Sequence, residues 1–213
     1  MRVLIIGDFH IPDRKKEIGL EIERSIARES KKTGIDFLAC TGDLTKADML
    51  EPVLSSWCSD YAVVQGNMDY DLRNAKGFPR KIVFDTAKYL LGTDVIKIGI
   101  THGHQVNPRG DRSSLSEIAQ EYGVHVLISG HTHAPSAVLH RRVDDGKQIL
   151  LLNPGSATGA WSFVASMTPS YILLDIMATK HGLEVTVTIH EFVDDKETKI
   201  GENHVFLGGT FVK

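Results

Sequence analysis

Short apolar runs recur along the first 130 residues, and each run ends at a glycine or a polar side chain. They occupy residues 3–6, 35–39, 61–64, 95–100 and 124–128. Large apolar residues in runs of four to six, bounded by glycine or polar groups, are typical of buried strands. The pattern therefore predicts five strands, with polar residues placed at strand ends rather than inside strands.

Helical periodicity separates the first two of these runs. Residues 17–31 place Ile18, Ile22 and Ile26 on one stripe, which is the spacing of a helix that packs one face against a core. Gly34 follows just past the end, where a glycine commonly terminates a helix. We expect a helix over these residues.

Two further helices are predicted from their starting signals. Thr45 with Asp48, and Ser114 with Glu117, have the spacing of a capping box, in which the first residue caps the helix. The second of these helices is expected to stop at Gly123. Alternation of helices and strands up to residue 130 predicts a largely parallel sheet covered by helices.

The pattern changes after residue 130. Runs over residues 138–143 and 148–152 flank a turn at residues 144–146 (Asp-Asp-Gly), which predicts a hairpin. A second, mostly antiparallel sheet is expected there. Residues 194–213 fit either an added hairpin or a frayed tail. We expect one α/β domain over residues 1–213, built from two sheets flanked by helices.

Composition excludes some partners. The 213-residue chain has 24 Lys and Arg against 27 Asp and Glu, a net charge of −3, and its longest basic run is Arg14-Lys15-Lys16. Binding of nucleic acid or of an anionic membrane surface is therefore not expected to be its main function. Cys40 and Cys58 show no metal-site or disulfide-scaffold spacing and are expected to be reduced thiols. With no signal-peptide core and no apolar run of about 18 residues, we expect a cytoplasmic protein.

Metal-binding side chains follow all five predicted strands. The stretches are Asp8-Phe9-His10, Gly42-Asp43, Gly66-Asn67-Met68-Asp69, His102-Gly103-His104 and Gly130-His131-Thr132-His133. The carboxyl ends of strands form the usual crevice of an open α/β sheet, so these stretches can converge. Side chains two residues apart in extended backbone point to the same side, so each Asp-x-His or His-x-His pair can offer two donors to one cavity. One such pair alone would usually be a solvated strand end; the series of five predicts a metal centre.

Donor chemistry narrows the choice of metal. Carboxylate, amide oxygen and imidazole without thiolate suit two divalent ions of manganese, iron or zinc. Asp43 is the predicted bridge between two ions about 3.5–4 Å apart, the spacing of two-metal hydrolases. The predicted ligands of the first ion are Asp8, His10, Asp43 and His133, and those of the second are Asp43, Asn67, His102 and His131.

The ordered series resembles the calcineurin-like metallophosphoesterases, whose signature runs Asp-x-His, Gly-Asp, Gly-Asn-His-Asp/Glu, His and Gly-His-x-His. Within that superfamily the chain is similar to the small subunits of retromer, and the similarity weakens only after about residue 178. The matching segments are residues 7–12, 40–42, 102–106, 128–133, 153–160 and 169–170. The resemblance implies two facing sheets with helices outside.

The retromer resemblance also implies partners. In that family the metal-side face packs into a large helical-solenoid subunit, and an opposite apolar patch recruits regulators of endosomal sorting. Val106 falls in a matching motif of the first surface, although Asn107 and Arg109 stand where relatives carry apolar side chains. Leu173 matches a position of the second patch, with burial in the core as the alternative. Such a protein would be peripheral on endosomes and would reach the membrane only through its complex.

Catalysis is the open question. Asp43 and Asn67 are the residues of the hydrolytic relatives, but Met68 replaces a histidine that protonates the leaving oxygen, and a thioether has no proton to give. General acid help is worth about 10²- to 10⁴-fold in rate. His104 is the candidate for a substitute acid; as alternatives, it orients a phosphate or fixes its loop.

Three functions therefore compete: a retromer subunit, a metal-dependent phosphodiesterase with weak activity on activated diesters, and a metal-stabilised fold without catalysis. The Gly-rich loop at residues 153–156 fits a wall of the cleft or, as the alternative, a phosphate cradle without a P-loop lysine.

Overall fold

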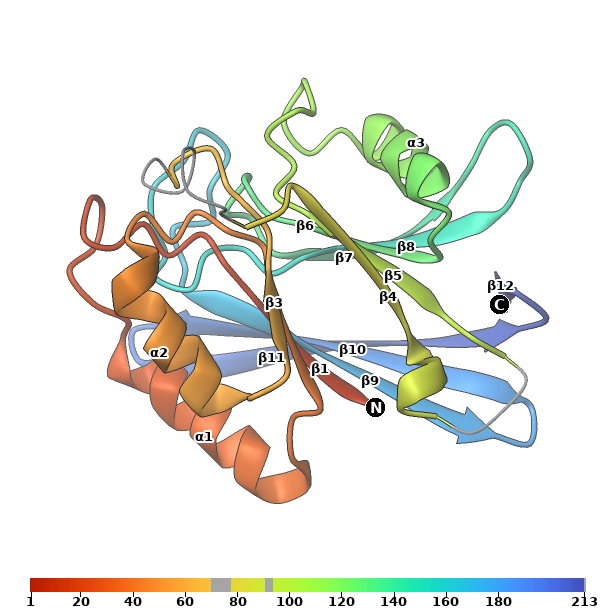
Figure 1. Ribbon diagram of the computed structural model, residues 1–213, viewed down its shortest axis with the longest axis horizontal. Helices are drawn as coiled ribbons and strands as arrows, with labels where there is room; N and C mark the ends of the chain where they lie inside the picture. The colour runs from red at the N-terminus through yellow and green to blue at the C-terminus, as the bar shows by residue number, and fades with distance from the viewer. Residues whose placement is uncertain (70–77, 91–93, 213) are drawn as a thin grey trace.

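The computed structural model describes residues 1–69, 78–90 and 94–212, and it places two β-sheets face to face with helices outside (Figure 1). The seven-stranded sheet has the spatial order β12 (Thr210–Val212), β11 (Lys196–Leu207), β10 (Gly182–Val193), β9 (Ser170–Thr179), β1 (Arg2–Ile6), β2 (Phe37–Cys40) and β3 (Tyr61–Val63). The five-stranded sheet has the order β4 (Lys81–Asp85), β5 (Lys97–Thr101), β6 (Val126–Ser129), β8 (Gln148–Asn153) and β7 (Ser136–Arg141). The predicted two-sheet α/β architecture is confirmed.

Helices cover the outer faces of the sandwich. Figure 1 shows α1 (Leu20–Thr33) and α2 (Ala47–Trp57) on the seven-stranded sheet and α3 (Arg112–Tyr122) on the other sheet, while a short 3-10 turn, η2 (Thr86–Lys88), follows β4. Within the described ranges, none of the helices combines the length and the hydrophobicity needed to cross a membrane.

The sequence predicts a parallel sheet from residues before about 130 and an antiparallel sheet from residues after it, and this assignment of strands to sheets was wrong. Each sheet takes strands from both halves: β9 to β12 extend the sheet of β1, β2 and β3, and β7 and β8 extend the sheet of β5 and β6. The halves are linked in one sheet by the antiparallel pairing of β1 with β9, which places Leu4 opposite Leu173, and in the other by the parallel pairing of β6 with β8. Strand pairing between distant segments follows from burial of both faces, which local periodicity does not encode.

Alternation along β1 produces two cores. Val3 and Ile5 point between the sheets, where they pack with β5, β6, β8, β9 and β10. Leu4 and Ile6 point the other way and pack under α1 and α2 against Ile22. Both faces of this strand are thus buried, which explains why its sequence is a continuous apolar run.

The predicted first helix is confirmed with a later start. Helix α1 begins at Leu20, after Gly19 as N-cap, and ends at Gly34, whose φ is +77°. Its buried stripe includes Ile22 and Ile26 as expected. A positive φ at the C-terminal cap is favourable only for a residue without a side chain.

Both predicted capping boxes were wrong. Helix α2 has Lys46 at its N-cap, because the backbone N–H of Thr45 is bound instead by the Asp69 carboxylate at 2.9 Å. Helix α3 is capped by Asp111, which accepts a hydrogen bond from the Ser114 N–H at 2.8 Å, three residues before the expected start. Its end at Gly123 is as predicted.

Residues 194–212 form strands rather than a frayed tail. The turn between β10 and β11 contains Asp194 and Asp195, with φ of +48° and +60°, and β12 pairs back on β11. Lys213, the last residue of the predicted tail, lies outside the described residues. The predicted hairpin at residues 138–152 is present as β7 and β8.

A buried carboxylate ties α1 to β11. Glu29 is 5% exposed and accepts hydrogen bonds from Lys32 at 2.9 Å and Lys199 at 2.8 Å. Burial alone would raise the pKa of Glu29, but the hydrogen bonds from the two lysines outweigh it and lower the pKa to about 2. The charged form therefore stabilises the attachment of α1 to the sheet.

We predict that Glu29→Gln lowers the free energy of unfolding by about 1.5–3 kcal/mol at pH 7, the typical value of hydrogen bonds to a charged group. A pKa lowered in the folded state stabilises the fold above the ordinary value of 4.5, and this contribution is lost as pH falls toward about 2. Denaturant titrations across pH should show the difference from wild type shrinking over that range. Glu184→Gln, on an exposed site of β10, is the control; an equal effect there would contradict the assignment.

Candidate metal centre

The predicted ligand stretches meet at one end of the sandwich. Strands β1, β2 and β3 are mutually parallel, and so are β5, β6 and β8, so their carboxyl ends lie together (Figure 1). The convergence is close: Nε2 of His10 lies 3.1 Å from Nε2 of His133, which is 123 residues away in sequence. The strand-end position expected from the sequence is therefore what brings these residues together.

The first group consists of Asp8, His10 and His133. Oδ1 of Asp8 lies 3.2 Å from Nε2 of His133 and 3.9 Å from Nε2 of His10. One donor atom from each of the three residues falls within 4.8 Å of the others, and all three side chains are buried. This arrangement can hold one divalent ion.

The second group is centred on Asp43. Its Oδ2 atom lies 3.4 Å from Nε2 of His102 and also 3.4 Å from Nε2 of His10. Oδ1 of Asn67 lies 3.0 Å from Nε2 of His102. Asp43 thus lies between His10 of the first group and His102 of the second, which is the place of a bridging carboxylate. Asp8 belongs to both groups, because one of its oxygen atoms also lies within 4.8 Å of ligand atoms of Asp43 and His102.

Backbone carbonyls fix which ring nitrogen faces the centre. Nδ1 of His102 lies 2.8 Å from the Thr41 carbonyl oxygen, and Nδ1 of His133 lies 2.7 Å from the Ala160 carbonyl oxygen. A carbonyl oxygen only accepts, so both Nδ1 atoms carry the hydrogen, and the two Nε2 atoms turn toward the carboxylates. Outer contacts of this type are usual for metal-binding histidines.

The resulting centre is crowded with hydrogen-bond acceptors, atoms that donate electron pairs. Oδ1 of Asp8 is buried and makes no hydrogen bond with any residue that the structure describes. Its neighbours are imidazole nitrogens and carboxylate or amide oxygens, which cannot satisfy it without a bound proton or cation. The residues therefore fit divalent metal ions, and the donor set of oxygen and imidazole suits manganese, iron or zinc. The Cys40 thiol is not a competing ligand, because burial raises its pKa.

The electrostatics of the imidazoles follow their surroundings. Burial lowers the pKa of His10 to about 4, against the opposing pull of Asp43 and Asp8, so His10 is neutral and can offer a lone pair. Burial also lowers the pKa of His131 to about 4, assisted by His102 and Arg109. Burial disfavours charge on Asp43 too, but its hydrogen bond with His102 holds the pKa of Asp43 below its usual range.

The backbone at the centre is in an unusual conformation. Positive φ values occur at five of the seven predicted ligands: Asp8 (+51°), His10 (+52°), Asp43 (+52°), His131 (+70°) and His133 (+59°). Left-handed backbone outside glycine costs about 1–3 kcal/mol per residue and is found where a site requires it. Local strain at successive strand ends is what turns these side chains into one cavity.

Asp69 holds the loops around the centre, a role the sequence did not reveal. Its buried carboxylate accepts hydrogen bonds from the N–H groups of Asp43 at 3.0 Å, Thr45 at 2.9 Å and Gly66 at 2.7 Å. The loops after β2 and β3 are thereby fixed to each other. The only sequence signal for this role is the position of Asp69 at the end of the Gly66-Asn67-Met68-Asp69 stretch.

The loop at residues 153–156 supports the same end of the sandwich. Nδ2 of Asn153 donates to the Gly130 carbonyl at 3.0 Å, and Oγ of Ser156 donates to the Asp8 carbonyl at 2.7 Å. Both side chains are buried. These contacts favour the wall of the cleft, since the polar groups already bind the metal-site loops.

The remaining predicted residues lie around this core. The His131 ring meets the His102 ring edge-on at a centroid distance of 5.1 Å, and the His131 N–H donates to Oδ2 of Asp8. His104 is exposed, with its ring centroid 5.5 Å from that of His102. The predicted partner residues Val106 and Leu173 are 4% and 3% exposed, so neither offers its side chain to the surface.

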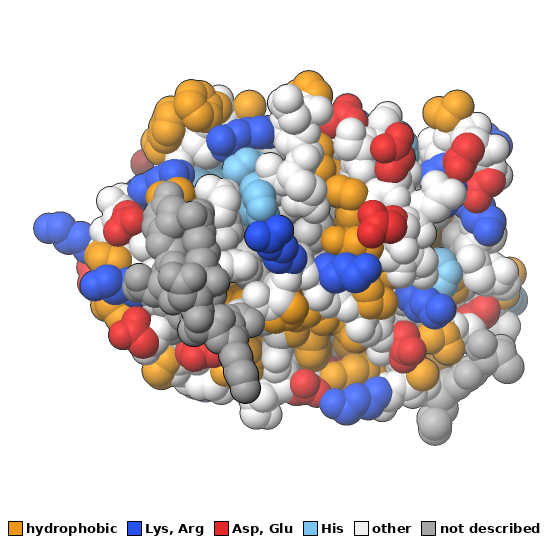
Figure 2. Space-filling view, turned by 45° about the horizontal axis from the view of Figure 1, so that its top comes forward, with side chains coloured by type: hydrophobic (Ala, Val, Ile, Leu, Met, Phe, Trp, Pro, Cys, Tyr) orange, Lys and Arg blue, Asp and Glu red, His pale blue; other side chains and the backbone are white. Residues whose placement is uncertain are grey.

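An exposed apolar loop borders the centre. The side chains of Trp161, Phe163 and Met167 are 53%, 76% and 55% exposed. The Arg109 guanidinium lies 5.2 Å from the centre of the Phe163 ring. Figure 2 shows histidine side chains at the surface with Lys and Arg side chains bordering them. Residues 161–167, called the rim loop below, could not be recognised as exposed from their apolar composition.

We predict that adding Mn²⁺ or Zn²⁺ raises the melting temperature of the protein, since a ligand that binds only the folded state stabilises it, by about 2.7 kcal/mol at 100 times its Kd. Asp43→Ala should lose most of this metal-dependent rise, and Glu184→Ala should keep it. Differential scanning calorimetry with and without chelator measures the effect. A melting temperature that metal and chelator leave unchanged would contradict a metal centre here.

This chain is similar in sequence and in fold to known proteins. A profile of the calcineurin-like phosphoesterase superfamily domain matches residues 1–179. A probable metallophosphoesterase of Methanocaldococcus jannaschii is 37% identical over 158 residues, which are 74% of this chain and 69% of the relative.

Two solved structures of vacuolar protein sorting 29 (Vps29) extend the comparison. That from Cryptosporidium parvum has a TM-score of 0.78 at 26% identity and covers 96% of this chain and 98% of its own. Wild-type Vps29 from Entamoeba histolytica, solved as a complex with Zn²⁺, has a TM-score of 0.73 at 30% identity, with coverage of 95% and 99%. The chain therefore belongs to the calcineurin-like phosphoesterase superfamily, and within it the chain is similar to Vps29.

Proposed function

We propose that the chain is a Vps29-like subunit of a retromer-type complex in endosome-to-Golgi sorting. It would bind a large helical-solenoid subunit through its metal-side face, act as one rigid block and reach endosomal membranes only within the complex. The similarity to Vps29 over almost the whole chain supports this role. The observation that carries it is the exposed rim loop beside the metal centre.

The rim loop has the composition of a binding surface. Its tryptophan, phenylalanine and methionine are residue types enriched in protein interfaces, and Arg109 stacked on Phe163 adds a fourth. Apolar side chains this exposed are normally covered when a patch is contiguous. The rings of Trp161 and Phe163 lie 5.0 Å apart, so they form one patch.

The rim loop is attached to the metal centre. The Ala160 carbonyl accepts from Nδ1 of His133, and the Ser166 N–H donates to the His133 carbonyl at 3.2 Å. Arg14 fixes the other side by donating to the Trp161 carbonyl at 2.6 Å. A partner that covers the rim loop would therefore also cover the metal centre.

We also propose that the chain binds regulators of endosomal sorting, although the surface expected for them, around Leu173, is not available. Leu173 is covered by α1 in the second core, together with Tyr171 and Ile22. Glu197, Arg28 and Lys199 form an ionic network at the neighbouring surface of α1 and β11. An apolar recruiting patch around Leu173 is not supported by this packing.

A metal-dependent phosphodiesterase is the second candidate. It is favoured by the convergence of five predicted ligands, Asp8, His10, Asp43, His102 and His133, with Asn67 and His131 in contact with His102. Two divalent ions, when bound, would supply charge stabilisation of a phosphoryl oxygen and a lowered water pKa. Asp8, His10, Asp43 and His133 would hold one, and Asp43, Asn67, His102 and His131 the other. His104, exposed beside His102, can deliver a proton to a leaving oxygen; Met68 cannot. Activity would be confined to diesters with good leaving groups.

We predict that Phe163→Ser together with Trp161→Ser weakens binding of the solenoid subunit at least about tenfold, because aromatic anchors at the centre of an interface contribute about 2 kcal/mol or more each. Affinity purification of the tagged chain from its own cells, with mass spectrometry of bound proteins, measures the loss.

The matched control for the rim loop is Val143→Ser. Val143 is 99% exposed in the turn between β7 and β8, at the opposite end of these strands from the metal centre. Its substitution should leave the complex intact. Purification of the wild-type chain with no helical-solenoid protein bound would remove the retromer reading.

We predict slow, Mn²⁺-dependent cleavage of bis(p-nitrophenyl) phosphate and no measurable cleavage of dialkyl phosphates, since the leaving group must depart with little protonation. His104→Gln should lower the rate on this activated ester by much less than the about 10²- to 10⁴-fold typical of a general acid, because p-nitrophenolate departs without a proton. Release of p-nitrophenolate is followed by absorbance.

Asp43→Ala provides the baseline for this activity. A wild-type rate equal to that of Asp43→Ala would exclude the phosphodiesterase and leave the retromer proposal untouched. If metal raises the melting temperature while neither turnover nor partner binding is found, a metal-stabilised fold is the remaining interpretation.

A further inference from the structure

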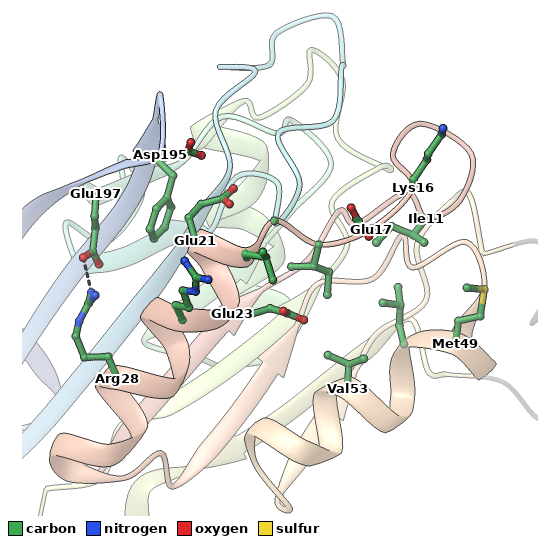
Figure 3. Close-up of a pocket in the computed structure, with 16 residues that line it drawn as sticks. Ile11, Lys16, Glu17, Glu21, Glu23, Arg28, Met49, Val53, Asp195 and Glu197 are labelled. Atoms are coloured by element: carbon green, nitrogen blue, oxygen red, sulfur yellow. Dashed lines mark hydrogen bonds and ion pairs between the residues drawn. The ribbon is translucent and has the colours of Figure 1, made fainter.

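A groove on the outer side of the loop that follows His10 takes no part in the metal centre. It lies between α1 and α2 and reaches the turn between β10 and β11, with a volume of about 900 Å³ (Figure 3). Protein pockets that bind ligands typically measure about 300–1,000 Å³. None of the seven predicted metal ligands lines it, so it is a separate feature with room for several side chains.

One wall of the groove is apolar and open to water. Met49 and Val53 lie one helical turn apart on α2 and face the groove (Figure 3). Met49 is 51% exposed, and Leu20 at the start of α1 is 61% exposed. Removing this surface from water would favour association with an apolar partner.

The facing wall is acidic. Of the lining residues, five are acidic and three are basic: Glu17, Glu21, Glu23, Asp195 and Glu197 against Lys16, Arg24 and Arg28. Figure 3 shows Glu23 extending from α1 toward Val53, while the ammonium group of Lys16 points away from the groove. Arg28 is already paired with Glu197. The open part of the groove therefore carries negative charge.

Helix stability explains only part of this charge. Glu21 and Glu23 lie in the first turn of α1, where a carboxylate interacts favourably with the helix dipole. Glu17 precedes the helix, and Asp195 belongs to a different element. Across residues 1–69, 78–90 and 94–212, no ion pair joins Glu17, Glu23 or Asp195 to a basic side chain. Their charge is available to a partner.

We propose that this groove binds a basic amphipathic segment of a partner protein, with apolar side chains against Met49 and Val53 and Lys or Arg side chains opposite Glu17 and Glu23. A segment with apolar residues at helical spacing laid into a hydrophobic groove is a recurrent mode of recognition. Charge complementarity would set its orientation and speed its binding. Anionic ligands, including phosphoesters and acidic lipid surfaces, are repelled by the same wall.

The test uses the full-length chain and a fluorescein-labelled peptide of leucine and lysine at helical spacing, with a leucine–glutamate peptide of the same pattern as the second probe. Fluorescence anisotropy should show binding of the lysine peptide, weakened by added salt as expected for charges near a surface. Glu17→Lys with Glu23→Lys, and separately Met49→Glu, should each weaken binding about tenfold or more. The glutamate peptide should not bind.

Glu184→Lys is the matched control, because it makes the same charge change on an exposed site of β10 outside the groove. It should bind like wild type. Three results would each overturn the proposal: no binding of the lysine peptide up to about 1 mM, equal weakening by Glu184→Lys, or equal binding of the glutamate peptide. Self-association of the wild type that Met49→Glu abolishes would instead make a second copy the occupant and equally refute it.

The two groove variants allow a check that is independent of the metal centre. Met49, Glu17 and Glu23 lie outside both cores, so circular dichroism and the metal-dependent rise in melting temperature should match wild type. Loss of peptide binding with that rise retained locates the effect in the groove. The outcome therefore does not depend on whether the chain is a retromer subunit or a phosphodiesterase.

Discussion

Crowding of hydrogen-bond acceptors at one end of the sandwich is the constraint on which the site depends. Oδ1 of Asp8 and Nε2 of His133 lie 3.2 Å apart, and Oδ2 of Asp43 and Nε2 of His102 lie 3.4 Å apart. Each contact opposes folding unless a proton or a cation lies between the two atoms, and the hydrogen bond between Asp43 and His102 supplies such a proton to the second contact. Left-handed backbone at the ligands adds to that cost. Burial of apolar side chains in the two cores on either face of β1 stabilises the fold and offsets both of these costs.

The loops that carry the ligands are stabilised by groups that never face the metal. Asp69 binds three backbone N–H groups with one carboxylate, and Asn153 and Ser156 bind carbonyls of the loops after β6 and β1. The bonds to the Asp69 carboxylate are charge-assisted and about twice as strong as neutral ones such as those of Asn153 and Ser156. The metal centre therefore rests on a polar network that is itself satisfied within the protein, while the acceptors in the middle are left for the ions.

Much of this could be predicted from the sequence, and the failures share one cause. The five stretches converge as the sequence predicts, because a strand end is a local signal and parallel strands bring their ends together. The sequence predicts Thr45 as a helix cap, but its backbone N–H donates to the carboxylate of Asp69, 24 residues later. The division into sheets failed at the pairing of β1 with β9, and the exposure of Trp161 and Phe163 depends on what surrounds them. Contacts between distant segments decide all three.

The hydrogen bond from His133 to the Ala160 carbonyl joins the rim loop directly to the candidate metal centre. Thermodynamic linkage is reciprocal: if a bound ion raises the affinity of a partner protein for the rim loop by some factor, the partner raises the affinity for the ion by the same factor. A chain that loses its metal ions when it is alone in a metal-poor compartment would retain them in the proposed complex. Binding of the partner and binding of the metal ions would then be coupled, so that a change in one changes the extent of the other.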